Sequence, residues 1–129
     1  QYTLMCNSKG GVIDDLIAYR NLDSDYFLIP NAANTASVFE VLKANAPAGI
    51  SVENLHEQFA VFALQGPKSI ELLNSLGVDC SLDYMAFSKS KFDGTDAILC
   101  RTGYTGELGF KSFPLGKMQE RYGIYYLIQ

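Results

Sequence analysis

The sequence predicts an α+β fold with a mostly antiparallel or mixed sheet and flanking helices. Short β-prone stretches and two helical stretches alternate along the 129 residues. Two pairs of β-prone stretches are separated only by a short turn, which joins antiparallel strands, whereas parallel strands need a long crossover. The chain is 48% hydrophobic and 19% charged, as expected of a folded chain with a core. We therefore favour α+β over a doubly wound parallel sheet.

The first half is expected to hold three strands and one helix. A turn-forming stretch of Asn, Ser, Lys and two Gly, residues 7–11, separates the first two strands. Val38 and Leu42 begin an apolar stripe of helical period, which ends at Pro47 and Gly49. The predicted strands cover residues 2–6, 12–19 and 25–30, and the helix covers residues 35–46.

The second half is expected to hold a buried strand, a helix and a late hairpin. Pro67 suits the first turn of the helix, and Gly77 suits its end. The dipeptide Asp93-Gly94 is typical of a tight hairpin turn. The predicted strand covers residues 59–64, the helix residues 67–76, and the hairpin strands residues 87–92 and 97–102.

Charge and residue counts exclude several functions. The net charge is −4 and the ten Lys and Arg are scattered, so we expect no nucleic-acid partner. No apolar run is long enough to cross a membrane, so we expect no membrane partner. Cys6, Cys80 and Cys100 are expected to be buried, reduced thiols. With no Cys-x-x-Cys and a single histidine, His56, in a polar turn, we expect neither a metal site nor a histidine base.

Asp14 and Asp15 lie inside an apolar β-prone stretch and are the first candidates for chemistry. Neighbouring side chains on a strand point to opposite faces, so Asp15 shares a face with Ile13, Ile17 and Tyr19. A carboxylate on an apolar face is costly unless it is paired or hydrated. The pattern fits either an acid satisfied by backbone donors at a bulge or a functional carboxylate.

Two further clusters are polar within apolar surroundings. Residues 101–110 carry glycines at a spacing of three, which suits a structural hairpin loop or a backbone that approaches a ligand closely. Asn31 directly follows a predicted strand, where it can cap the next helix or hold a ligand. Tyr2, Tyr19 and Tyr104 can stack on a flat heterocycle or simply pack.

Four motifs in order resemble the glycine cleavage system T-protein family, the aminomethyltransferases. They are Gly-Gly-Val-Ile-Asp-Asp-Leu-Ile at 10–17, Asn-Ala-Ala-Asn at 31–34, Ala-Leu-Gln-Gly-Pro at 63–67 and Arg-Thr-Gly-Tyr-Thr-Gly-Glu at 101–107. The resemblance covers residues 2 to about 110 and corresponds to a middle fragment of a protein nearly three times as long. It therefore implies an incomplete portion of the family's multidomain folate-binding fold.

The resemblance also implies an activity, partners and site residues. The family transfers the methylene group of aminomethyl-lipoyl H-protein to tetrahydrofolate and releases ammonia. Tetrahydrofolate is then the co-substrate, no metal is involved, and lipoylated H-protein is the partner. Asp15 matches the catalytic carboxylate, which also holds the pterin, and Gln65-Gly66-Pro67 matches a structural turn. The folate-contacting positions match Tyr2, Asp15, Tyr19, Asn31 and Tyr104.

The sequence differs from the family pattern at one position, and two alternative functions remain open. The family has an acid that helps to bind folate where this chain has Lys111. We therefore expect a partial folate-binding region over residues 1–110 and a divergent or truncated tail over 111–129. The rivals are the folate domain of a dimethylglycine or sarcosine dehydrogenase relative and a non-catalytic folate-binding iron–sulfur assembly protein. The expected location is the cytoplasm of a bacterium, or the mitochondrion if the source is eukaryotic.

Overall fold

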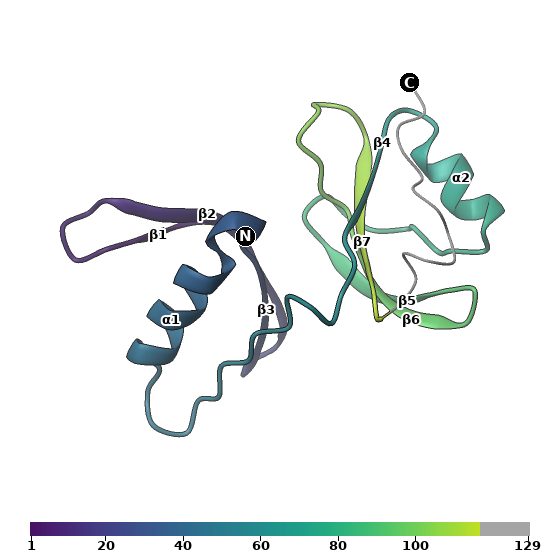
Figure 1. Cartoon of the computed structure of the whole chain (residues 1–129). Helices are drawn as coiled ribbons and strands as arrows, with labels where there is room; N and C mark the ends of the chain where they lie inside the picture. Colours follow the sequence, from purple (N-terminus) through teal and green to yellow (C-terminus); the bar gives the residue numbers. More distant parts are fainter. Residues whose placement is uncertain (117–129) are drawn as a thin grey trace. The chain divides into compact units, whose positions relative to one another are not determined.

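The computed structural model describes residues 1–116, which fold as two compact units (Figure 1). The first unit is Gln1–His56 and the second begins at Glu57. Each unit combines an antiparallel sheet with one α-helix, so the predicted α+β class is confirmed. None of the helices in the described part of the chain is long and apolar enough to cross a membrane.

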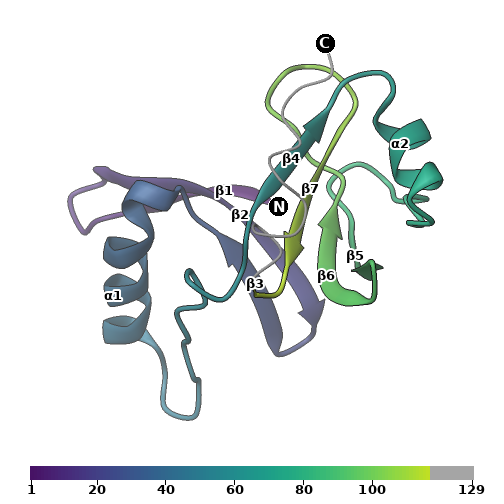
Figure 2. The same cartoon turned by 45° about the vertical axis from the view of Figure 1, so that its right-hand side comes forward.

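The first unit is a three-stranded antiparallel sheet in the order β1-β2-β3, with one helix beside it (Figures 1 and 2). A single turn of 3-10 helix, Ala32–Asn34, leads from the sheet into the helix, whose buried residue is Val38. The predicted hairpin is confirmed, and its second strand runs three residues further than expected. The elements are β1 (Tyr2–Cys6), β2 (Val12–Leu22), β3 (Asp25–Ile29) and α1 (Thr35–Asn45).

The second unit is a four-stranded antiparallel sheet in the order β4-β7-β6-β5, with α2 packed on one face (Figure 2). Asp93 and Gly94 both have positive φ, as the predicted tight turn between β5 and β6 requires. The elements are β4 (Phe62–Gln65), α2 (Ser69–Ser75), β5 (Phe87–Phe92), β6 (Thr95–Cys100) and β7 (Gly109–Pro114). The core under α2 is formed by Leu73, Val78, Cys80, Leu99 and Phe110.

Strand β7 was missed by the sequence prediction. Its residues, Gly-Phe-Lys-Ser-Phe-Pro, include a glycine, a lysine and a proline, which are depleted in strands. The strand nevertheless pairs with β4 on one side and β6 on the other. The expected domain boundary after residue 110 falls within this strand. Residues 117–129 lie outside the described residues, so the divergent tail stays a prediction.

The cysteine prediction is wrong in one place. Cys80 and Cys100 are buried free thiols, as expected, but Cys6 is exposed. Cys6 is the last residue of β1, where the register shifts between Met5 and Cys6. Its apolar neighbours in sequence therefore did not indicate burial, because the side chain lies at the irregular end of a strand.

Candidate functional site

Asp14 and Asp15 lie in the first half of β2 and face opposite sides of the first sheet. Asp14 is only 2% exposed, whereas Asp15 is exposed. The alternation of a strand requires this separation. The two adjacent carboxylates therefore have different environments, and the two sequence-based interpretations can be tested for each of them separately.

Asp14 is a buried carboxylate whose hydrogen bonds are satisfied. It accepts hydrogen bonds from the Asn31 backbone N–H at 2.9 Å, from Asn31 Nδ2 at 3.0 Å and from Asn34 Nδ2 at 2.6 Å. Burial raises the pKa of Asp14, but these hydrogen bonds outweigh burial and hold the pKa below its ordinary value of 3.8. Asp14 thus ties β2 to the segment that enters α1.

We expect Asp14→Asn to destabilise the protein by about 1–3 kcal/mol, because the new NH₂ group faces donors instead of accepting from them. Since the folded pKa is lowered, the contribution of Asp14 is complete above pH 3.8 and is lost as the pH falls through the folded pKa. Urea unfolding between pH 7 and pH 2.5 measures both effects. Between pH 7 and pH 2.5 the variant should lose less of its free energy of unfolding than the parent does. An equal loss in the variant and the parent would contradict the role assigned to Asp14.

Asp15 is an exposed carboxylate held in place by two neighbours. Tyr2 donates its hydroxyl hydrogen to Asp15 Oδ2 at 2.9 Å, and Asn31 Nδ2 donates to Asp15 Oδ1 at 2.9 Å. In the β1–β2 register Leu4 lies opposite Asp15, so Tyr2, two residues from Leu4, is on the same face. Each carboxylate oxygen has further lone pairs available to accept a ligand N–H.

Asn31 joins the two carboxylates and does not cap a helix. Its side chain makes no capping hydrogen bond to the 3-10 turn that follows it. Instead Nδ2 lies within hydrogen-bond distance of Asp14 Oδ1, Asp15 Oδ1 and the Asp15 backbone oxygen. Of its two sequence-based interpretations, capping is therefore wrong, and the amide fixes the position of Asp15. The hydrogen bond from the Asn34 side chain to Asp14 was not predicted. The signal that could have indicated it is a second asparagine three residues after Asn31.

Tyr19 shares the face of β2 that carries Asp15, as predicted, but its ring is only 2% exposed. It lies opposite Phe27 of β3. The Tyr19 side chain is thus buried in this structure, and its role as a ligand contact stays a prediction.

Tyr104 lies in the second unit, in the loop that connects β6 and β7. Its side chain is 74% exposed. The Lys111 ammonium lies 3.7 Å from the centre of the Tyr104 ring and donates a hydrogen bond to its hydroxyl oxygen. Lys111 is itself only 5% exposed. Sequence reasoning noted Lys111 as an unusual residue but gave no signal that it contacts Tyr104.

The described residues hold no group of three or more His, Cys, Asp and Glu side chains arranged for a metal ion. His56 lies exposed in a turn. The candidate site of the first unit is thus an acid, a phenol and an amide, Asp15, Tyr2 and Asn31. Such a group can accept hydrogen bonds from, and place negative charge beside, a polar heterocycle.

Comparison with known proteins identifies the family of this chain. A family model described as the GCVT N-terminal domain matches residues 1–113. Curated relatives named aminomethyltransferase are 54% identical in Mycobacterium avium, 52% in a Parafrankia species and 49% in Mycobacterium leprae. Each alignment covers 88% of this chain and 31% of the relative, so the chain spans about a third of their length. The chain belongs to the GCVT N-terminal domain family.

Proposed function

We propose that this chain is part of an aminomethyltransferase of the glycine cleavage system. The reaction transfers the methylene group of the aminomethyl-lipoyl arm of H-protein to tetrahydrofolate and releases ammonia. The relatives named aminomethyltransferase support this assignment over the dehydrogenase and iron–sulfur assembly alternatives. Because these relatives are bacterial, the proposed location is the bacterial cytoplasm.

The observation that carries the proposal is the exposed Asp15 carboxylate, fixed between Tyr2 and Asn31. A carboxylate that is held before the substrate arrives needs no reorganisation when charge develops. In the proposed reaction two folate N–H nitrogens bond to the methylene carbon as its bonds to the amine nitrogen and to the lipoyl sulfur break, and the two protons leave with ammonia and the thiol. Positive charge develops on the folate nitrogen as it attacks. Asp15 would orient the pterin by accepting its N–H hydrogens and would stabilise that positive charge.

The tyrosines have a different proposed role. Tyr2 is 58% exposed beside Asp15 and presents both a hydroxyl and a ring. Tyr104 is exposed in the second unit, and Tyr19 lies further along the Asp15 face of β2. Exposed rings such as those of Tyr2 and Tyr104 can pack on a flat heterocycle, so we propose both as folate contacts together with Asn31. Tyr19, which is buried within its unit, is kept as a further proposed contact.

The direct test is a transfer assay on the intact protein that contains this sequence. Aminomethylated H-protein and tetrahydrofolate are supplied, and methylenetetrahydrofolate and ammonia are measured. Formation of both in equal amounts supports the proposal. If the protein instead oxidises dimethylglycine or sarcosine, or binds folate without any transfer, one of the two rival functions is correct.

Lys111 offers a second test, because an ammonium stands where the family has an acid. In the intact protein we expect Lys111→Glu to strengthen tetrahydrofolate binding about five- to thirtyfold, or about 1–2 kcal/mol. The change removes the cation from Tyr104 and supplies an acceptor for a pterin N–H. Calorimetric titration measures it, with Lys111→Met as the control that removes the cation without adding an acceptor. Weaker binding in Lys111→Glu than in the parent would contradict this role.

A further inference from the structure

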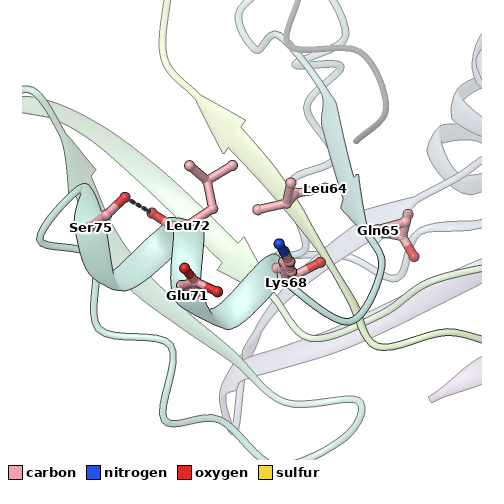
Figure 3. Close-up of a pocket in the computed structure, with 7 residues that line it drawn as sticks. Leu64, Gln65, Lys68, Glu71, Leu72 and Ser75 are labelled. Carbon is pink, nitrogen blue, oxygen red and sulfur yellow. Dashed lines mark hydrogen bonds between the residues drawn. The ribbon is translucent and has the colours of Figure 1, made fainter. Parts of the chain in front are cut away.

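Gln65 lies at the end of β4, opposite Gly109 of β7. Its neighbour Leu64 belongs to the surface that packs against the core under α2. The Gln65 side chain therefore projects from the other face of the sheet. A cleft of about 190 Å³ lies at this end of β4, with Leu64, Gln65 and Leu72 among its lining residues. Figure 3 shows the Leu64 side chain turned toward Leu72 and the Gln65 side chain on the opposite side of the strand.

The Gln65 amide contacts both ends of the loop that carries Tyr104. Nε2 donates to the Phe110 backbone oxygen at 3.2 Å and lies 3.5 Å from the Thr102 backbone oxygen. Thr102 lies just before residues 103–108 of this loop, and Phe110 follows them in β7. Since both partners are acceptors, the amide must direct its nitrogen toward them, and its oxygen is turned the other way.

Two glycines make room for that oxygen. A Cβ added to Gly103 or to Gly109 would lie 2.0 Å from Gln65 Oε1. Neither glycine has a positive φ, so the backbone conformation by itself does not demand glycine at these positions. Oε1 is buried and has no hydrogen-bond partner among the described residues. Two of the regularly spaced glycines are therefore explained by the space that one side chain occupies.

The turn after Gln65 supports the same loop at a third place. The Gly66 N–H donates to the Leu108 backbone oxygen at 2.7 Å. The buried Ser69 hydroxyl lies 2.7 Å from the Gly66 oxygen and 3.4 Å from the Leu108 oxygen. The loop is thus fastened at Thr102, Leu108 and Phe110, whereas Tyr104 between them is exposed.

We infer that Gln65 is a positioning residue for Tyr104: it fastens the two ends of segment 103–108 of the β6–β7 loop and so fixes where the tyrosine ring is presented to the ligand. The inference rests on the proposed function only for the identity of that ligand, tetrahydrofolate. The fastening of the loop is a property of the second unit and can be measured without any ligand.

The first experiment measures hydrogen exchange of the loop amides by mass spectrometry in the intact, ligand-free protein. We expect Gln65→Ala to speed exchange at residues 103–108 at least tenfold and to leave the β5–β6 hairpin unchanged. The matched control is Lys68→Ala, because Lys68 is exposed three residues away. Unchanged loop exchange in Gln65→Ala would overturn the inference, whatever the ligand is.

The second experiment tests whether Gly103 is glycine because of Gln65. Gly103→Ala should speed loop exchange by displacing the Gln65 amide. In the Gln65→Ala background the added methyl has room, so Gly103→Ala should then have no further effect. Equal effects in both backgrounds would show that Gly103 acts independently of Gln65, and would overturn the inference that Gly103 makes room for the Gln65 amide.

The third experiment tests the link to Tyr104 through tetrahydrofolate affinity, measured by calorimetry. We expect Gln65→Ala to weaken binding about tenfold in the parent and to have no further effect in a Tyr104→Ala background. An equal loss in both backgrounds would overturn positioning through Tyr104. A further outcome is that Tyr104→Ala alone leaves the tetrahydrofolate affinity unchanged while Gln65→Ala still speeds hydrogen exchange of the loop. In that case the proposed folate contact of Tyr104 is wrong, and the fastening of the loop by Gln65 is supported.

Discussion

Asp15→Asn should lower turnover in the intact protein at least tenfold and leave its fold in place. The change keeps the shape of the side chain but removes its charge, and it places an NH₂ group beside donors from Tyr2 or Asn31. Removing one preorganised electrostatic contact in well-studied sites costs about 2.7–4 kcal/mol of transition-state stabilisation. Because Asp15 is exposed, the folded protein tolerates the change. Steady-state transfer kinetics and urea unfolding measure the two effects separately.

The matched control is Asp14→Asn on the other face of the same strand. Asp14 is buried and satisfied by Asn31 and Asn34, so its loss should reduce stability and affect turnover much less. Asp15→Asn should thus mainly lower turnover, whereas Asp14→Asn should mainly lower the free energy of unfolding. Equal kinetic damage from both changes would show that the two faces of β2 do not divide the roles in this way.

The 129-residue chain expressed alone should show no transfer activity and should bind tetrahydrofolate weakly or not at all. It spans about a third of the length of its relatives, and the proposed activity belongs to the whole protein. In the first unit Tyr2, Leu4 and Val12 are each more than half exposed. Apolar surface left in water costs roughly 25 cal/mol per Å², and a large patch of it drives association. We therefore also expect poor solubility or self-association.

Two measurements on the purified chain check this expectation. Sedimentation velocity reports self-association, and calorimetric titration of the monomer fraction with tetrahydrofolate reports binding. A dissociation constant in the low micromolar range would mean that the chain carries a complete folate site. The proposal that the site needs further parts of a longer protein would then be wrong.

The local elements could largely be predicted from sequence. Residues 7–11 and the Asp93-Gly94 turn predict the two hairpins, because each turn conformation favours few residue types. Alternation along β2 placed Asp14 and Asp15 on opposite faces, which the structure confirms. The four ordered motifs also indicated the family that the comparison then established. All of these signals lie within a few residues of one another or depend on residue order.

The tertiary structure decided which partners these residues meet. Alternation does not say which face of β2 is covered, and the structure buries Asp14 while it exposes Asp15. The bridge from Asn31 to both carboxylates spans 16 and 17 residues. Strand β7 has little strand propensity of its own and forms because β4 and β6 pair with it from both sides.

The sequence by itself determined the fold class, the hairpins, the family and the residue types of the candidate site. Only the tertiary structure decided that Asn31 holds Asp15, that Lys111 lies on Tyr104, and that Gln65 occupies the space beside Gly103 and Gly109. The physical reason is the range of the interactions. Turn geometry and side-chain alternation are set by neighbouring residues, whereas hydrogen bonds and close packing between distant residues exist only after the chain has brought them together.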